Sequence, residues 1–145
     1  MRPAHSCCKW MLDLKNLISA RLAGNILIGF SFLFLIFHGL ALIGLVPAEL
    51  VWGGQTAEEP SSLQYLEIFA VVINIIFLVV VAAKVGYIRA HNLIRFINIC
   101  LWIILVYLFM SVGSNLVSMR SAENLVFTPV IALLALLIYR LLLEE

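Results

Sequence analysis

One apolar segment, Tyr65–Lys84, restricts the possible folds more than any other part of this sequence. It reads YLEIFAVVINIIFLVVVAAK and is apolar almost throughout, yet it carries Glu67 and Asn74. A segment of this kind predicts a membrane-spanning helix. Glu67 and Asn74 are seven positions apart, so a helix places them on one face. Because a carboxylate or amide facing lipid is penalised by roughly 1–3 kcal/mol, we expect that face to turn toward other protein.

The composition extends this interpretation to the whole chain. Of its 145 residues, 64% are hydrophobic and only 12% are charged. Soluble domains are nearer half apolar and a quarter charged, so the chain is predicted to be an all-α integral membrane protein in contact with the lipid bilayer. The net charge of +1 gives no reason to expect a nucleic-acid partner. We expect residues 1–145 to form a single membrane domain.

Four apolar segments predict a bundle of four transmembrane helices. The predicted spans cover roughly residues 24–46, 63–83, 96–117 and 125–143. In the last of these, a helix starting at Thr128 would leave only about 15 residues before Leu143, too few for an upright span. We therefore expect this helix to start near Ser121 and to contain Pro129, which would kink it.

An amphipathic segment, residues 9–22, precedes the first span. Trp10, Leu14 and Ile18 are among its apolar residues at helical spacing, whereas Lys9 and Asp13 are on the other side. This pattern is typical of a helix lying at the membrane surface. The alternative is a cytosolic extension of the first span.

The basic residues are distributed unevenly between the two predicted sides of the membrane. Eight of the nine fall on the side of the termini, and only Arg120 falls on the other. The eight are Arg2, Lys9, Lys15, Arg21, Lys84, Arg89, Arg95 and Arg140. The positive-inside rule therefore predicts both termini in the cytoplasm, in a bacterial inner membrane or a plasma membrane.

Polar residues from three spans are predicted at similar depth, in the outward half of the bundle. Together with a tryptophan of the first outer loop they define a candidate ligand-binding pocket: His38, Trp52, Glu67, Asn74, Tyr107, Ser111 and Asn115. The alternative is that these groups only hydrogen-bond neighbouring helices and hold the bundle together.

No motif in the sequence predicts a reaction. It contains no H-E-x-x-H, G-x-S-x-G, P-loop or C-x-x-C pattern, so we assign no catalytic residue, metal site or cofactor. His38 and Glu67 could serve as a base and its orienting group. Their predicted position at the same depth in the membrane is not enough to support that role.

Several short patterns occur between residues 50 and 143. They are Val51-Trp52-Gly53-Gly54, Glu67, and the stretch from Ser114-Asn115-Leu116 through Glu123 to Phe127-Thr128-Pro129. In these patterns the chain resembles small four-span proteins of bacterial membranes. The resemblance implies the four-span fold and no activity or partner.

Two functions remain as hypotheses from the sequence. The first is an accessory or scaffold subunit that acts through interactions with a protein partner or with copies of itself. The second is a ligand-binding or transport protein that uses the candidate pocket for a small molecule. The spans and short loops favour the first, and the polar residues within the spans motivate the second.

Overall fold

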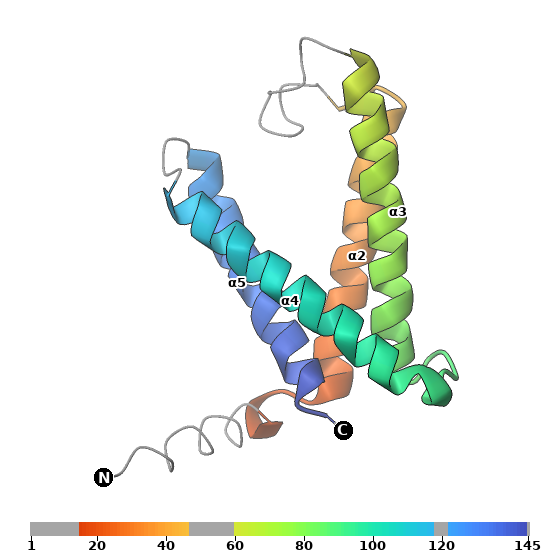
Figure 1. The fold of residues 1–145 in the computed structure, drawn as a ribbon. Helices are drawn as coiled ribbons and strands as arrows, with labels where there is room; N and C mark the ends of the chain where they lie inside the picture. Colours follow the sequence, from red (N-terminus) through yellow and green to blue (C-terminus); the bar gives the residue numbers. More distant parts are fainter. Residues whose placement is uncertain (1–14, 47–59, 118–121, 145) are drawn as a thin grey trace. The chain divides into compact units, whose positions relative to one another are not determined.

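The computed structural model describes residues 15–46, 60–117 and 122–144, and every regular element among them is a helix. The elements are α2 (Ala20–Leu42), α3 (Pro60–Val85), the short 3-10 helix η3 (His91–Leu93), α4 (Ile94–Val117) and α5 (Ala122–Leu142) (Figure 1). The predicted all-α class is confirmed.

Three helices are long and apolar enough to cross a membrane. They contain the segments Ala20–Leu42, Gln64–Val85 and His91–Gly113, while Thr128–Leu142 of α5 is a shorter apolar helix. Large apolar side chains such as Phe32, Ile76 and Trp102 are half-exposed, as expected for helices in contact with lipid chains. The chain is therefore a multi-pass membrane protein.

Local signals explain why α2 begins and ends earlier than the predicted span of residues 24–46. The Ser19 Oγ accepts a hydrogen bond from the Leu22 N–H at 3.2 Å, which caps the first turn. At the other end Gly44 adopts a φ of 75°. The Gly44 N–H donates to the Ala41 carbonyl and the Leu45 N–H to the Leu40 carbonyl, so the helix stops in a Schellman motif.

The other helices also differ from the predicted bounds at their ends. α3 begins at Pro60, where a proline is favoured as the first helical residue, rather than at 63. It ends at Val85, and the next residue, Gly86, has a φ of 90°. α5 begins at Ala122 and contains Pro129 within the helix, as the sequence predicts.

The N-terminal segment is described only from residue 15. The predicted interfacial helix, residues 9–22, falls largely outside the described residues. Residues 15–17 are helical, the chain leaves helical geometry at Ile18 and Ser19, and residues 20–22 form the first turn of α2. The predicted helix is therefore interrupted at Ile18 and Ser19, and its last residues belong to α2.

The chain divides into two compact units, each described by itself. The hairpin unit is Ile28–Val79, and the terminal unit is Met1–Leu27 with Val80–Glu145. In the terminal unit α4 packs along α5. Its buried apolar residues include Ile97, Leu101 and Leu105 of α4 and Ala135, Ile138 and Leu141 of α5. These positions recur every three or four residues, as helix packing requires.

Candidate functional site

The most polar contact within the hairpin unit joins α2 to α3. His38 Nδ1 lies 2.6 Å from Glu67 Oε2. The Glu67 side chain is 1% exposed and that of His38 is 17% exposed. Buried carboxylates in membrane proteins are retained where another group pairs with them, and here the imidazole is one such partner. The imidazole donates the hydrogen bond when the carboxylate is ionised.

Two aromatic rings surround the imidazole on α2. The ring of Phe34 stacks at a centroid distance of 6.4 Å, and that of Phe37 presents its edge at 5.5 Å. An apolar surrounding strengthens the hydrogen bond to Glu67, because the local dielectric constant is low. Chemically, a carboxylate and an imidazole in contact can hold a proton between them or orient the ring as a base. Since Nδ1 contacts Glu67, exchange with another group would use Nε2.

A second contact follows one heptad further along both helices. Asn74 Nδ2 donates to the Ser31 carbonyl at 3.2 Å. Asn74 is seven residues after Glu67 on α3, and Ser31 is seven before His38 on α2. This register requires α2 and α3 to run antiparallel, and it places the two contacts along one seam. The buried Ser31 Oγ has no hydrogen-bond partner among the described residues.

The remaining residues of the predicted pocket are not part of this seam. Trp52 lies outside the described residues, and the side chain of Asn115 is not described. Tyr107 and Ser111 belong to α4 of the terminal unit, where Tyr107 is 67% exposed and the Ser111 hydroxyl donates to the Tyr107 carbonyl at 3.0 Å. The structure therefore brings together His38 and Glu67, continues their seam to Asn74, and leaves the full pocket a prediction.

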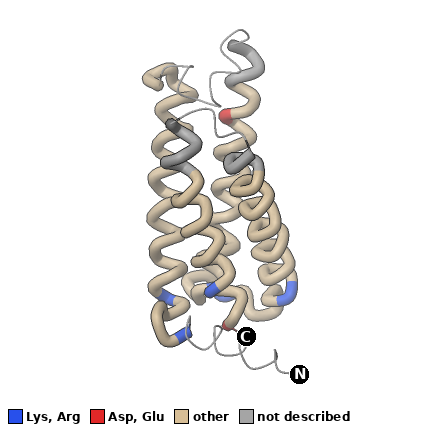
Figure 2. The backbone as a smooth tube through the Cα atoms, turned by 90° about the vertical axis from the view of Figure 1, so that its left-hand side faces the viewer, with Lys and Arg blue, Asp and Glu red and all other residues tan. Residues whose placement is uncertain are grey.

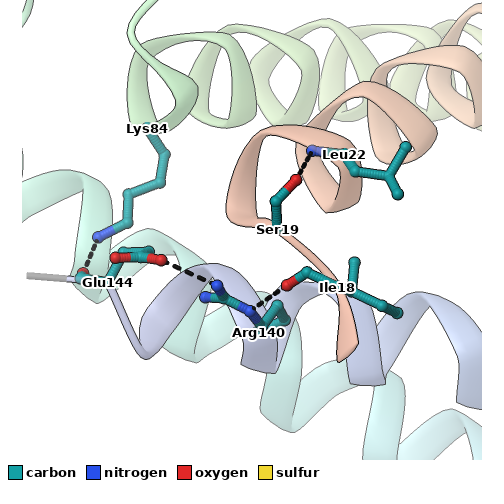
Figure 3. A network of polar contacts seen from close by, with 6 residues as sticks. All are labelled: Ile18, Ser19, Leu22, Lys84, Arg140 and Glu144. Carbon is teal, nitrogen blue, oxygen red and sulfur yellow. Dashed lines mark hydrogen bonds and ion pairs between the residues drawn. The ribbon is translucent and has the colours of Figure 1, made fainter. Parts of the chain in front are cut away.

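A second polar network, which the sequence did not predict, lies at one end of the terminal unit. The described Lys and Arg residues gather at that end, close to the C-terminus (Figure 2). Lys84 Nζ donates to the Asn98 Oδ1 at 2.9 Å and to the Glu144 carbonyl at 2.7 Å. Figure 3 shows how Glu144 lies between Lys84 and Arg140.

Arg140 is the buried cation of this network, with a side chain 4% exposed. Its Nε donates to the Ile18 carbonyl at 2.6 Å, and its Nη2 donates to Glu144 Oε1 at 2.9 Å. The Ile18 carbonyl lies where the chain leaves helical geometry, so it lacks an intrahelical donor. An arginine so near the end of an apolar helix suggests snorkelling to water. Here the guanidinium also has partners inside the protein.

A third set of polar contacts belongs to the same unit. The Tyr87 hydroxyl donates to Asn25 Oδ1 at 2.8 Å, and the Arg21 guanidinium carbon lies 6.0 Å from the centre of the Tyr87 ring. These contacts connect the start of α2 to the turn after α3. The sequence contains a signal for this site, since Asn25 is polar within an otherwise apolar segment.

Metal binding is not indicated where the structure describes the chain. Among residues 15–46, 60–117 and 122–144, no group of three or more His, Cys, Asp or Glu side chains is placed to hold a metal ion. Comparison of the whole chain with known proteins finds no matching family model, no matching curated protein and no matching solved structure.

Proposed function

We propose that this multi-pass membrane protein is a four-span bundle that acts through protein–protein interaction, as an accessory or scaffold subunit. The fourth span is supported by the full length of α5, whose 21 residues extend about 31 Å at ~1.5 Å each. That length matches a hydrocarbon core of about 30 Å. The lipid bilayer is then the environment of all four helices.

The observation that carries the interaction hypothesis is the internal pairing of buried polar groups. Glu67 contacts His38, and Arg140 contacts both Ile18 and Glu144. These groups support helix packing, which is the commoner use of polar residues in membrane bundles. Among the described residues, many large apolar side chains remain exposed.

The exposed face of α4 is the surface that we assign to a partner. Trp102, Tyr107 and Met110 on this face are 52%, 67% and 71% exposed. Aromatic residues and methionine are enriched at protein interfaces, and methionine adapts to irregular partner surfaces. Contact with lipid would not require aromatic residues or methionine, because aliphatic side chains would serve equally well there.

Site-specific photocrosslinking in native membranes tests this assignment. A benzophenone amino acid at Trp102 should yield an adduct of one defined mass with a protein, either a partner or a second copy of the chain. The matched control replaces Phe32, an apolar α2 residue that is 54% exposed, and should yield lipid adducts. Lipid adducts alone at Trp102, Tyr107 and Met110 would refute the interaction hypothesis.

The second candidate function is ligand or proton binding at the seam of the hairpin unit. The contact between His38 and Glu67 favours it, because such a pair holds an exchangeable proton in an apolar surrounding. A small molecule that co-purifies with the parent protein and is lost on Glu67→Gln, with folding intact, would favour this function. Co-purification of a stoichiometric protein that survives the substitution would favour the first.

The orientation that we propose has both termini in the cytoplasm. It is supported by the basic residues, eight of nine of which fall on the side of the termini when four spans are counted. The membrane is then a bacterial inner membrane or a plasma membrane.

A further inference from the structure

Glu144 lies between two cations at the end of the terminal unit. Its carbonyl accepts a hydrogen bond from Lys84 Nζ at 2.7 Å, and its Oε1 accepts one from Arg140 Nη2 at 2.9 Å (Figure 3). One residue thus presents two oxygens to two side chains that come from different helices, α3 and α5. An arrangement of this kind also suits an anion with several acceptor oxygens, such as a phosphate group.

Arg140 has a hydrogen-bond donor that no group in the described part of the chain uses. The residue is only 3% exposed, and its Nη1 is buried with no hydrogen-bond partner among the described residues. An unpaired buried donor carries a desolvation penalty. This unfilled donor is independent of the contacts to Glu144, and it belongs to the same guanidinium.

Glu144 is the part of this network that can leave most readily. Its side chain is 45% exposed, and the residue follows the last helical residue of α5, Leu142. Lys84 and Arg140, by contrast, are fixed within the last turns of their helices. An anion from outside can therefore compete with Glu144 for the two cations without unfolding either helix.

We propose that the phosphate group of an anionic phospholipid binds between Lys84 and Arg140 in place of Glu144. Both cations lie in the last turns of apolar helices, where a helix end reaches the depth of the lipid headgroups. The phosphate oxygens would accept hydrogen bonds from Lys84 Nζ and Arg140 Nη2, the donors that Glu144 now occupies. Glu144 acts as an internal competitor in this arrangement. The inference goes beyond the proposed protein–protein function and does not depend on it.

Titration of phosphatidylglycerol into the detergent-solubilised full chain, read by native mass spectrometry, tests the site. Lys84→Gln should weaken binding about fivefold, in line with the contribution of one basic residue to anionic-lipid attraction. Arg95→Gln is the matched control, because Arg95 is an exposed basic residue of the same unit and neutralising it removes the same charge. The proposal is overturned if both substitutions weaken binding equally.

Removing the charge of Glu144, the internal competitor, should have the opposite effect on phosphatidylglycerol affinity. Glu144→Gln should strengthen phosphatidylglycerol binding several-fold, whereas Glu145→Gln, which removes the same charge at the next position, should change it less than twofold. Equal effects of the two substitutions would mean that only net charge matters, and would overturn the site. Circular dichroism of each variant confirms that the helices are retained.

The source of the phosphate is decided by two further titrations of the parent protein. Phosphatidylcholine should bind more weakly than phosphatidylglycerol, because its choline neutralises the headgroup. Phosphatidylglycerol nanodiscs should raise the unfolding temperature of the protein above its value in phosphatidylcholine nanodiscs. Inorganic phosphate added to the protein in phosphatidylcholine nanodiscs should not produce this rise. An equal rise with inorganic phosphate would overturn the lipid as the ligand.

Discussion

His38 on α2 and Glu67 on α3 are in contact through Nδ1 and Oε2 at 2.6 Å, and they are 29 residues apart in the sequence. Asn74 and the Ser31 carbonyl repeat the contact one heptad along, at 3.2 Å. Helices in lipid gain little from the hydrophobic effect when they associate, so polar contacts and close packing set their register. The seam formed by these four residues therefore determines how α2 pairs with α3 in the hairpin unit.

Glu67→Leu should lower the free energy of unfolding by about 1–3 kcal/mol, because His38 Nδ1 then loses an interior partner. Glu67→Gln retains the size and most of the hydrogen-bonding capacity, so it should cost less than the leucine variant. Denaturant titration in bicelles measures both.

A double variant provides the control for this pair. His38→Leu combined with Glu67→Leu replaces both partners by apolar groups, and it should be more stable than Glu67→Leu alone. Additive losses in the double variant would show that the contact itself contributes nothing, and a Glu67→Leu protein as stable as the parent would contradict the seam.

Ser31 and Asn74 should respond in different ways to apolar substitution. Asn74→Leu removes the bond to the Ser31 carbonyl and should cost about 0.6 kcal/mol, the average for such contacts in a membrane protein. Ser31→Ala removes a buried hydroxyl that has no partner among the described residues, so its effect should lie within about 0.5 kcal/mol of zero or be stabilising. The same bicelle titration distinguishes them, and a larger loss for Ser31→Ala than for Asn74→Leu would contradict the assignment.

Gly24 is expected to be intolerant of any side chain. A Cβ at this position would overlap Val85 Cγ2 and lie 3.3 Å from Val85 Cβ, a contact that β-branched Val85 cannot relieve by a small shift. Gly24→Ala should therefore destabilise the protein by about 1–3 kcal/mol. Thermal unfolding in detergent, followed by circular dichroism, measures the loss.

Two further variants make the Gly24 result specific. Val85→Ala should restore much of the stability of Gly24→Ala, because it removes the clashing methyl groups. Gly29→Ala, where a Cβ meets nothing within 4 Å, should be neutral or stabilise α2 by up to about 1 kcal/mol. Equal losses at the two glycines would indicate a helix-wide effect and not a close approach at Gly24.

Cysteine labelling tests the proposed orientation of the chain. In a variant lacking Cys7, Cys8 and Cys100, a cysteine at Gln55 should react with an impermeant maleimide in intact cells. A cysteine at His91 should react only after the membrane is permeabilised. The reverse pattern would place the termini outside and contradict the positive-inside argument.

Much of the helical structure was predictable, because it depends on interactions between near neighbours. The apolar segments predict α2, α3 and α4, and the seven-residue spacing of Glu67 and Asn74 predicts that they share a face. The signals that end the helices are equally local: Ser19 precedes α2, and Gly44 and Gly86 follow α2 and α3. The predicted span of residues 24–46 missed the signals at Ser19 and Gly44, because its bounds followed hydropathy alone.

The partners of the polar side chains were decided by tertiary structure. His38 was one of several donors at suitable depth for Glu67, and nothing within a single helix distinguishes it from the others. The choice depends on the register between α2 and α3, which a pattern within one helix does not contain. Arg140 shows the same limit more strongly: its local sequence resembles that of a snorkelling arginine, whereas its partner Ile18 is 122 residues away. Hydropathy determines which segments enter the membrane, and only the packed helices determine which polar groups meet there, because each buried group must find its partner across a helix interface.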